Sequence, residues 1–199
     1  MRSKPLAKTI IGLCISLLAV TGCTSLISAN NQPSTANPDK STNELASFGF
    51  ENMQAAEIID LLEATPLAER SSDFLASVRP ESLTLSDQTG KEISLEMPAD
   101  RFYVSIAPYT EQTHDCYFHS LTTCVGEIRG ETLTVIVNDD EGNELLNKET
   151  KTADNGFIGL WLPRDIQGTL TIEHDGLSTE LPLSTGDSDP TCITTARLS

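Results

Sequence analysis

Basic side chains are scarce in this sequence of 199 residues, which has 13 Lys and Arg against 29 Asp and Glu and a formal net charge of −16. Such an acidic surface repels phosphate backbones and anionic headgroups, so nucleic acid is not an expected partner. Aromatic residues are also few, at 5% of the chain with a single Trp. The 38% of hydrophobic residues is nevertheless enough for a packed core in a chain of this length.

Motifs of the common enzyme classes are missing as well. The chain has no Gly-x-Ser-x-Gly elbow, phosphate-binding loop or His-Glu-x-x-His pair, and no paired carboxylates stand out. Residues 139–143 resemble a calcium loop only in composition, because the alternating oxygen ligands and the terminal Glu are lacking. A hairpin turn is the better interpretation of that run, and the sequence does not predict a true enzyme.

The first 22 residues have the pattern of an export signal. They open with three basic residues, Arg2, Lys4 and Lys8. The apolar stretch 9–20 is too short to span a bilayer as a mature helix, and small residues stand directly before Cys23, as in a bacterial lipobox. We therefore expect cleavage before Cys23, lipidation of its thiol and anchoring as a membrane lipoprotein of the periplasm or cell envelope. The alternative is an ordinary signal peptide cut near Ala29.

A tether and a helical segment are expected after the anchor. Residues 23–42 are polar and interrupted by Pro, which predicts the lipid anchor followed by a flexible tether. Residues 43–80 have helical periodicity, with apolar side chains on one stripe and acidic side chains, Glu63 among them, largely opposite. Thr65 and Pro66 resemble an N-cap and a first helical position, so a second helix should begin there. This helical hairpin contains no Cys or His, and we interpret it as structural or as the contact of a homodimer.

From residue 81 onward the spacing of apolar residues changes to two, which is typical of half-buried strands. We expect strands at 83–85, 93–97, 102–106, 133–137, 158–162, 169–173 and 177–183. Short strands separated by turn signals at this spacing indicate an antiparallel sandwich or small barrel. The fold class is therefore α+β, with an N-terminal helical hairpin followed over 81–199 by an antiparallel β-sandwich or small barrel that carries three of the five cysteines.

The cysteine count points to chemistry. Cys14 would leave with the signal and Cys23 would be lipidated, so Cys116, Cys124 and Cys192 remain. An exported protein that uses cysteine only for cross-links normally has an even number, so one thiol needs a metal, a redox role or a partner. Three thiolates suit Cu(I), a soft ion, whereas three Cys with one His are nearer to what structural zinc prefers.

The run around the first two of these cysteines must turn back on itself if both thiols are to share an ion. Residues 116–124 would separate them by about 12 Å as a helix and by about 26 Å when extended. A reversal at 120–123 would bring them together. His114 shares a face with the first cysteine in an extended chain and His119 does so in a helix, so either could ligate. Cys192 reaches the site only if the C-terminal tail folds back across the sheet.

Spacing alone leaves alternatives open. A Cys116–Cys124 disulfide that pins a loop is as well supported as a metal site. A blue-copper centre is disfavoured, since it needs two His and an axial Met, and no His or Met follows Cys192. A thiol oxidoreductase with Cys116 as nucleophile and His119 as base lacks the usual Cys-x-x-Cys arrangement. His174, in a hairpin turn, is expected to be solvated.

Six short runs around the cysteines form a pattern: 104–109, 113–116, 119–124, 156–157, 161–164 and 189–195. With these runs the chain resembles the CueP family of periplasmic copper-binding proteins over roughly residues 45–199. The resemblance implies that Cys116, Cys124 and Cys192 bind Cu(I) and that the protein contributes to periplasmic copper resistance. It is also compatible with reduction of Cu(II) to Cu(I) and with delivery of copper to other exported proteins, as a metallochaperone does.

Three thiols also permit a redox reaction. Cu(II) oxidises thiols, so two ions could be reduced while two cysteines form a disulfide and the third holds the product. Turnover would require an external thiol donor, which makes the protein a stoichiometric reductant and carrier more than a true enzyme. The alternative without metal is a structural lipoprotein stabilised by a disulfide.

Overall fold

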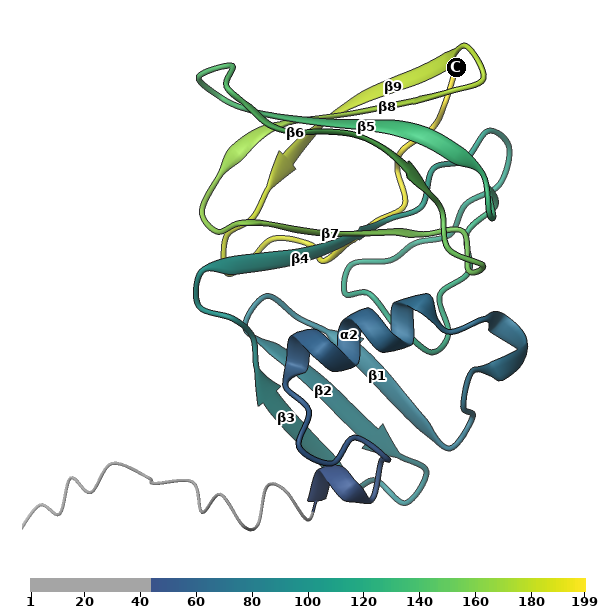
Figure 1. Cartoon of the computed structure of the whole chain (residues 1–199), viewed down its shortest axis with the longest axis vertical. Coiled ribbons are helices and arrows are strands. Elements are labelled where there is room, and N and C mark those ends of the chain that lie inside the picture. Colours follow the sequence, from purple (N-terminus) through teal and green to yellow (C-terminus); the bar gives the residue numbers. More distant parts are fainter. Residues whose placement is uncertain (1–43) are drawn as a thin grey trace, which may run out of the picture. The chain divides into compact units, whose positions relative to one another are not determined.

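The structure, a computed structural model, describes residues 44–199 (Figure 1). The predicted signal peptide 1–22, the lipidation site Cys23 and the tether to residue 42 lie outside this range. Residues 44–46 are helical, and the next elements are α2 (Ala55–Ala64) and the short 3-10 helix η1 (Leu67–Glu69). The strands follow: β1 (Phe74–Val78), β2 (Ser82–Asp87), β3 (Glu92–Glu96), β4 (Arg101–Ile106), β5 (Thr132–Asp139), β6 (Glu144–Lys151), β7 (Ile158–Pro163), β8 (Gln167–His174), β9 (Leu177–Ser184) and β10 (Cys192–Ile193). Within residues 44–199, no helix is long and apolar enough to cross a membrane.

The strands form three open sheets. One has the order β1-β2-β3, the second β10-β4-β7 and the third β6-β5-β8-β9. All neighbours are antiparallel except β10, which runs parallel to β4. The α+β class and the largely antiparallel strands are therefore confirmed, and the sheets remain open instead of closing into the small barrel that was the alternative.

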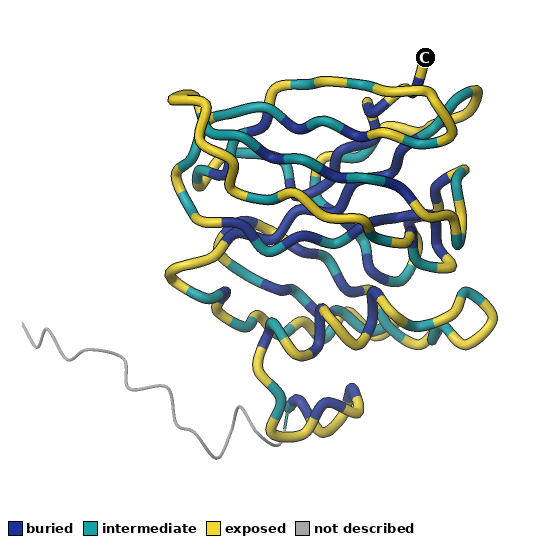
Figure 2. Tube along the Cα trace, turned by 45° about the horizontal axis from the view of Figure 1, so that its top comes forward, coloured by how far each residue is buried: buried dark blue, intermediate teal, exposed yellow. Residues whose placement is uncertain are grey.

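The sheet β10-β4-β7 is covered on both faces. Phe102, Val104 and Ile106 of β4 point into a core shared with the four-stranded sheet. Tyr103, between them in sequence, points the other way into a second core made with α2 and the sheet β1-β2-β3. Figure 1 shows these two groups of elements on opposite sides of β4 and β7, and Figure 2 shows how much of the interior they bury. Strand β4 therefore alternates between two cores, which explains why nearly all of it is buried.

The predicted helical hairpin is not confirmed, because its second half is a strand. Residues Phe74–Val78 form β1, which pairs antiparallel with β2. Ala76 and Val78 are fully buried whereas Leu75 is 54% exposed, as the period of two in a strand requires. A run of five residues, four of them apolar, fits the period of a helix and that of a strand. Pairing with β2 makes it a strand. The helix before it is α2, which begins with a capping box formed by Gln54 and Glu57.

Strand β6 (Glu144–Lys151) was not predicted from the sequence. Its residues are almost all exposed, and it lies at the edge of the four-stranded sheet. An edge strand without a buried face has no apolar alternation to detect, so only its backbone pairing with β5 defines it.

Candidate metal centre

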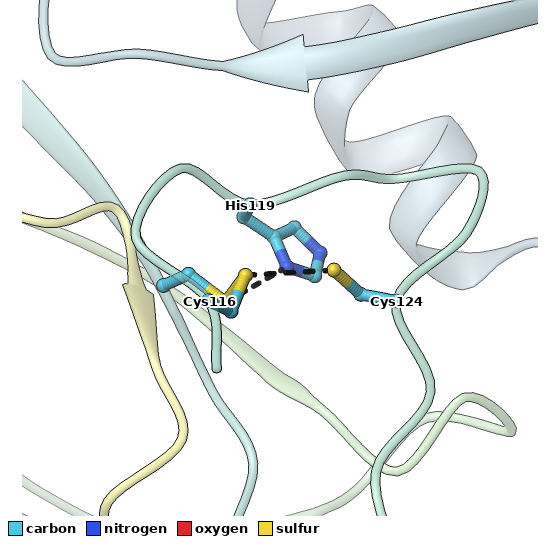
Figure 3. Close-up of side chains that lie close together, drawn as sticks. Cys116, His119 and Cys124 are labelled. Carbon is cyan, nitrogen blue, oxygen red and sulfur yellow. Dashed lines mark hydrogen bonds between the residues drawn. A yellow bond between two sulfur atoms is a disulfide. The ribbon is translucent and has the colours of Figure 1, made fainter. Parts of the chain in front are cut away.

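Four side chains from two distant parts of the chain come together at one point. The donor atoms of Cys116, His119, Cys124 and Cys192 all lie within 4.8 Å of one another. Figure 3 shows the three that belong to one loop pointing toward each other. The convergence that the sequence required therefore occurs, and it includes one of the two candidate histidines. His114 lies outside the cluster, on an exposed part of the chain.

The loop that carries three of these residues is fastened to the edge of β1. The backbone N–H of Val78 donates to the carbonyl of His119 at 2.8 Å, and that of Leu121 donates to the carbonyl of Ala76 at 2.9 Å. Leu121 is also fully buried in the core under α2. The chain then reverses over 121–123 and returns to Cys124, whose N–H donates to the carbonyl of Ser120 at 3.1 Å. Strand β1, where the sequence predicted a helix, thus holds the loop in place.

The C-terminal tail brings in the remaining cysteine. Cys192 lies in β10, opposite Ser105 of β4. The preceding Thr191 fixes the tail to the loop, because its hydroxyl donates to the Val78 carbonyl at 2.6 Å and accepts from the His119 N–H at 3.0 Å. The expectation that the tail folds back across the sheet is confirmed.

The sulfur atoms are in an oxidised arrangement. Cys116 and Cys192 form a disulfide with a Cα–Cα distance of 5.7 Å, and Cys124 is free. The sulfur of Cys124 lies 3.6 Å from that of Cys116 and accepts from the Ser120 N–H at 3.4 Å. The bridge therefore joins a different pair from the Cys116–Cys124 disulfide considered from spacing. Parallel pairing of β10 with β4 is the reason, since it places Cys192 beside the loop.

Glu63 lies behind the cluster and was misplaced by the sequence pattern, which put it on the polar face of its helix. It is 8% exposed and accepts hydrogen bonds from Tyr103 (2.6 Å), Ser105 (3.2 Å) and Asn155 (2.6 Å). Burial raises its pKa, but the charge of His119 and the hydrogen bonds from Tyr103 and Asn155 outweigh burial and lower the pKa to about 2. The residue is therefore an ionised carboxylate in the interior. A signal was present, because Glu63 is four and eight residues after two buried residues of α2, Ile59 and Ala55.

His119 joins this carboxylate to the sulfur atoms. Its Nε2 lies 2.9 Å from Oε2 of Glu63, in an ion pair whose N–H is not aligned as in a hydrogen bond. Its Nδ1 lies 3.8 Å from the sulfur of Cys192, and its ring packs on Phe157 with centroids 4.7 Å apart. Burial lowers the pKa of His119, but the charge of Glu63 and the neighbouring Cys124 raise it to about 9.

His119 also changes the pKa of the Cys124 thiol. Burial raises the pKa of its thiol, but interaction with His119 lowers the pKa below the ordinary value. The guanidinium of Arg70 adds positive charge nearby, since its Nη1 donates to the Cys124 carbonyl at 2.8 Å. The free sulfur is thus favoured as a thiolate, which is the form that binds metals.

Close backbone packing fixes the position of Asn155 relative to the loop. The N–H of Gly126 donates to the Asn155 carbonyl at 2.6 Å, and a Cβ atom on Gly126 would lie 2.7 Å from the carbonyl oxygen of Gly156. Gly156 itself has a φ of +79°, which other residues rarely adopt. Glycine at both positions lets the segment after Cys124 pack against the turn that presents Asn155 to Glu63.

In chemical terms, the cluster offers three sulfur donors and one imidazole nitrogen once the disulfide is reduced. This donor set is soft, and it suits Cu(I) or a tetrahedral zinc ion better than magnesium or calcium, which prefer oxygen. In the oxidised form two of the sulfurs are bonded to each other, so the disulfide excludes metal binding through all three sulfurs and leaves Cys124 and His119 as donors.

The pKa of His119 predicts a pH-dependent stability that can be isolated in a Cys124→Ser variant, in which the opposing shift of the thiol is absent. A group with a higher pKa in the folded state stabilises the fold fully below its unfolded pKa of 6.5, and this stabilisation is lost as pH rises through the folded pKa. That pKa is about 9 in the wild type and lower in the variant, because Cys124 is one of the groups that raise it, but Glu63 still keeps it raised. Urea unfolding over this range should show the unfolding free energy falling with pH. A Cys124→Ser protein that also carries His119→Gln should lack the fall, and equal slopes in the two proteins would contradict the assignment.

Comparison with known proteins agrees with this chemistry. A family model described as periplasmic copper-binding protein CueP matches residues 57–197. The crystal structure of S.CueP is similar, with 35% sequence identity and a TM-score of 0.74, covering 80% of this chain and 97% of that chain. A search of the curated proteins gives no match. The resemblance inferred from the sequence is thus confirmed, and the chain belongs to the CueP family of periplasmic copper-binding proteins.

Proposed function

We propose that the reduced protein binds Cu(I) through the thiolates of Cys116, Cys124 and Cys192, with His119 as a nitrogen donor. The observation that carries the proposal is the convergence of these four donor atoms within 4.8 Å in a member of a copper-binding family. The lowered pKa of Cys124 supports it, because a thiolate must form before the metal binds. In the periplasm such a site would sequester Cu(I) and contribute to copper resistance.

Access from solvent supports exchange of copper with other exported proteins. Cys116 is only half-buried, and a pocket of about 250 Å³ opens beside it. The pocket is lined by Cys116, Cys192, Tyr117 and Pro190, among others. An incoming thiol or a copper-accepting protein would meet the sulfur atoms on this side, which makes delivery of Cu(I) part of the proposal.

The disulfide supports a second part of the proposal, the reduction of Cu(II). Two thiols, those of Cys116 and Cys192, would give up two electrons and two protons and form the bond seen in the structure. Two Cu(II) ions would take one electron each and become Cu(I), and Cys124 with His119 would retain one of them. An external thiol donor must then reduce the bridge, so the reaction is stoichiometric for each reduced protein.

Removal of single thiols tests Cu(I) binding. Anaerobic titration of the reduced protein against a chromophoric Cu(I) chelator should give one tightly bound ion. Changing Cys116, Cys124 or Cys192 to Ser should weaken binding by more than the roughly 10- to 100-fold that a lost outer-shell contact produces. The exposed His114 is outside the cluster, so His114→Ala is the matched control and should bind as the wild type does. Wild-type affinity in all three Ser variants would favour the structural lipoprotein instead.

The oxidation products test the redox step. Reduced protein mixed with Cu(II) should yield two Cu(I) ions and lose two thiols, and mass spectrometry of peptides should find the Cys116–Cys192 bond. A Cys124→Ser variant keeps both reacting thiols, so it should still yield two Cu(I) ions but retain less of the product. A bond to Cys124 in the wild type, or no loss of thiols, would contradict the scheme.

The membrane anchor is proposed from the sequence, since Cys23 lies outside the described residues. Lipidation should place the wild-type protein in the membrane fraction and add the mass of the acyl groups to the peptide that begins with Cys23. Cys23→Ser should release the protein into the soluble fraction or leave its signal uncleaved. A soluble wild-type protein that starts near residue 30 would show that an ordinary signal peptidase acts instead.

A further inference from the structure

We infer that Glu63 is a positioning residue, which orients His119 so that Nδ1 faces the three sulfur atoms and Nε2 does not. The inference rests on the proposed function, because it assigns the atom through which His119 would bind copper. The two ring nitrogens have different surroundings, with Nε2 at 2.9 Å from the Glu63 carboxylate and Nδ1 at 3.8 Å from the Cys192 sulfur. Glu63 lies in α2, far in sequence from the cysteine loop, so the pattern of cysteines and histidines in that loop does not indicate a role for it.

The donors around Glu63 show that it acts only as an acceptor. The hydroxyls of Tyr103 and Ser105 point at Oε2, and Oε1 accepts from the side-chain amide of Asn155. The orientation of that amide is fixed, because its oxygen accepts from the backbone N–H of Phe157 at 2.9 Å. Asn155 must therefore present its NH₂ group to Glu63. The ionised carboxylate satisfies the amide donor on Oε1 and both hydroxyls on Oε2, because it has no hydrogen of its own to share.

This arrangement determines which nitrogen of His119 carries a hydrogen. A bare nitrogen lone pair 2.9 Å from an anionic oxygen would be repelled, so Nε2 must be protonated in both the neutral and the cationic ring. Nδ1 is then the atom whose lone pair is available once its proton leaves, and it is also the atom on the sulfur side. A carboxylate beside the distal ring nitrogen of a ligating histidine is a recurrent feature of metal sites.

The residues that hold Glu63 are buried and closely packed, and they orient its carboxylate. Ser105, Asn155 and His119 are fully buried, and Tyr103 is 2% exposed. Tyr103 and Ser105 are alternate residues of β4 and thus lie on the same face of that strand. A Cβ atom on Gly159 of β7 would collide with the Tyr103 hydroxyl, so glycine at that position leaves room for the hydroxyl to reach Glu63. Preorganised support of this kind keeps a ligand within the geometry that binding needs.

A purely structural role is the competing interpretation, since a buried ion pair that loses one partner also destabilises a fold. A measurement on the imidazole itself separates the two roles. With ¹⁵N-labelled histidine, the wild type loaded with Cu(I) should show a hydrogen on Nε2 of His119 and a metal-shifted Nδ1. In metal-free reduced protein above the pKa of His119, the neutral ring should be the Nε2–H tautomer.

The variant Glu63→Gln tests the cause of this orientation. Glutamine has nearly the same shape but turns one acceptor into a donor, so it cannot accept from all three partners and from His119. The Nε2–H signature should be lost or mixed, and the affinity for Cu(I) should fall about 10- to 100-fold. Glu57→Gln makes the same change at an exposed position of the same helix and keeps a residue that a capping box accepts, so it should change neither quantity.

The possible outcomes separate the inference from the proposed function. An Nδ1–H tautomer in the wild type, or an unchanged imidazole spectrum and affinity in Glu63→Gln, would overturn the role of Glu63 even if the cysteines bind copper. An Nε2–H tautomer in a protein whose cysteines do not bind Cu(I) would leave the positioning intact and remove the proposed function. The tautomer of the wild type needs no variant, so a failure of Glu63→Gln to fold leaves this test in force.

Discussion

The buried contact between the Glu63 carboxylate and the His119 ring connects all the parts of this site. Glu63 comes from α2, the donors around it come from β4 and the turn at 155–157, and His119 comes from the loop with two cysteines. An ion pair removed from water destabilises a fold unless other hydrogen bonds satisfy the remaining polar atoms. Here Tyr103, Ser105 and Asn155 donate to the buried carboxylate of Glu63. The helix, the sheet and the loop therefore depend on one another to stabilise this buried charge.

Strand β4 provides the fixed frame for that contact. Its even-numbered side chains fill the core under the four-stranded sheet, and its odd-numbered ones face α2. The strand also pairs with β7 on one edge and with the short β10 on the other. Strand β4 is packed on both faces and both edges. It therefore fixes the positions of Tyr103 and Ser105, which contact Glu63, relative to Cys192 in β10.

Local patterns in the sequence were sufficient to predict a strand where one face of the strand is buried and the other is not. Strands β2, β3, β5 and β7 to β9 show that alternation, whereas β4 was found from its apolar spacing although both its faces are buried. The reversal near residue 121 follows from the requirement that two thiols share one ion. The pattern failed at Phe74–Val78, which is too short to distinguish the two periods, and at β6, which has no buried face. Glu63 was misjudged because its partners lie 40, 42 and 92 residues away, so only the tertiary structure shows why a charge is buried there. The choice of Cys192 as the disulfide partner depended in the same way on the pairing of β10.

The bond between Cys116 and Cys192 closes a covalent ring across 76 residues of sequence. It adds to the noncovalent contacts of the carboxyl-terminal tail, which are the pairing of β10 with β4, the backbone hydrogen bonds of Tyr109 with Ala196 and Leu198, and the burial of these two residues in the core. In the oxidised protein the sulfur bridge ties the carboxyl-terminal tail down, and under the proposed function a bound copper ion would tie down the same two side chains. The reduced protein without copper has neither link, and only noncovalent contacts then hold its tail. We expect this empty, reduced form to be less stable than the other two, so that binding of cargo also stabilises the fold.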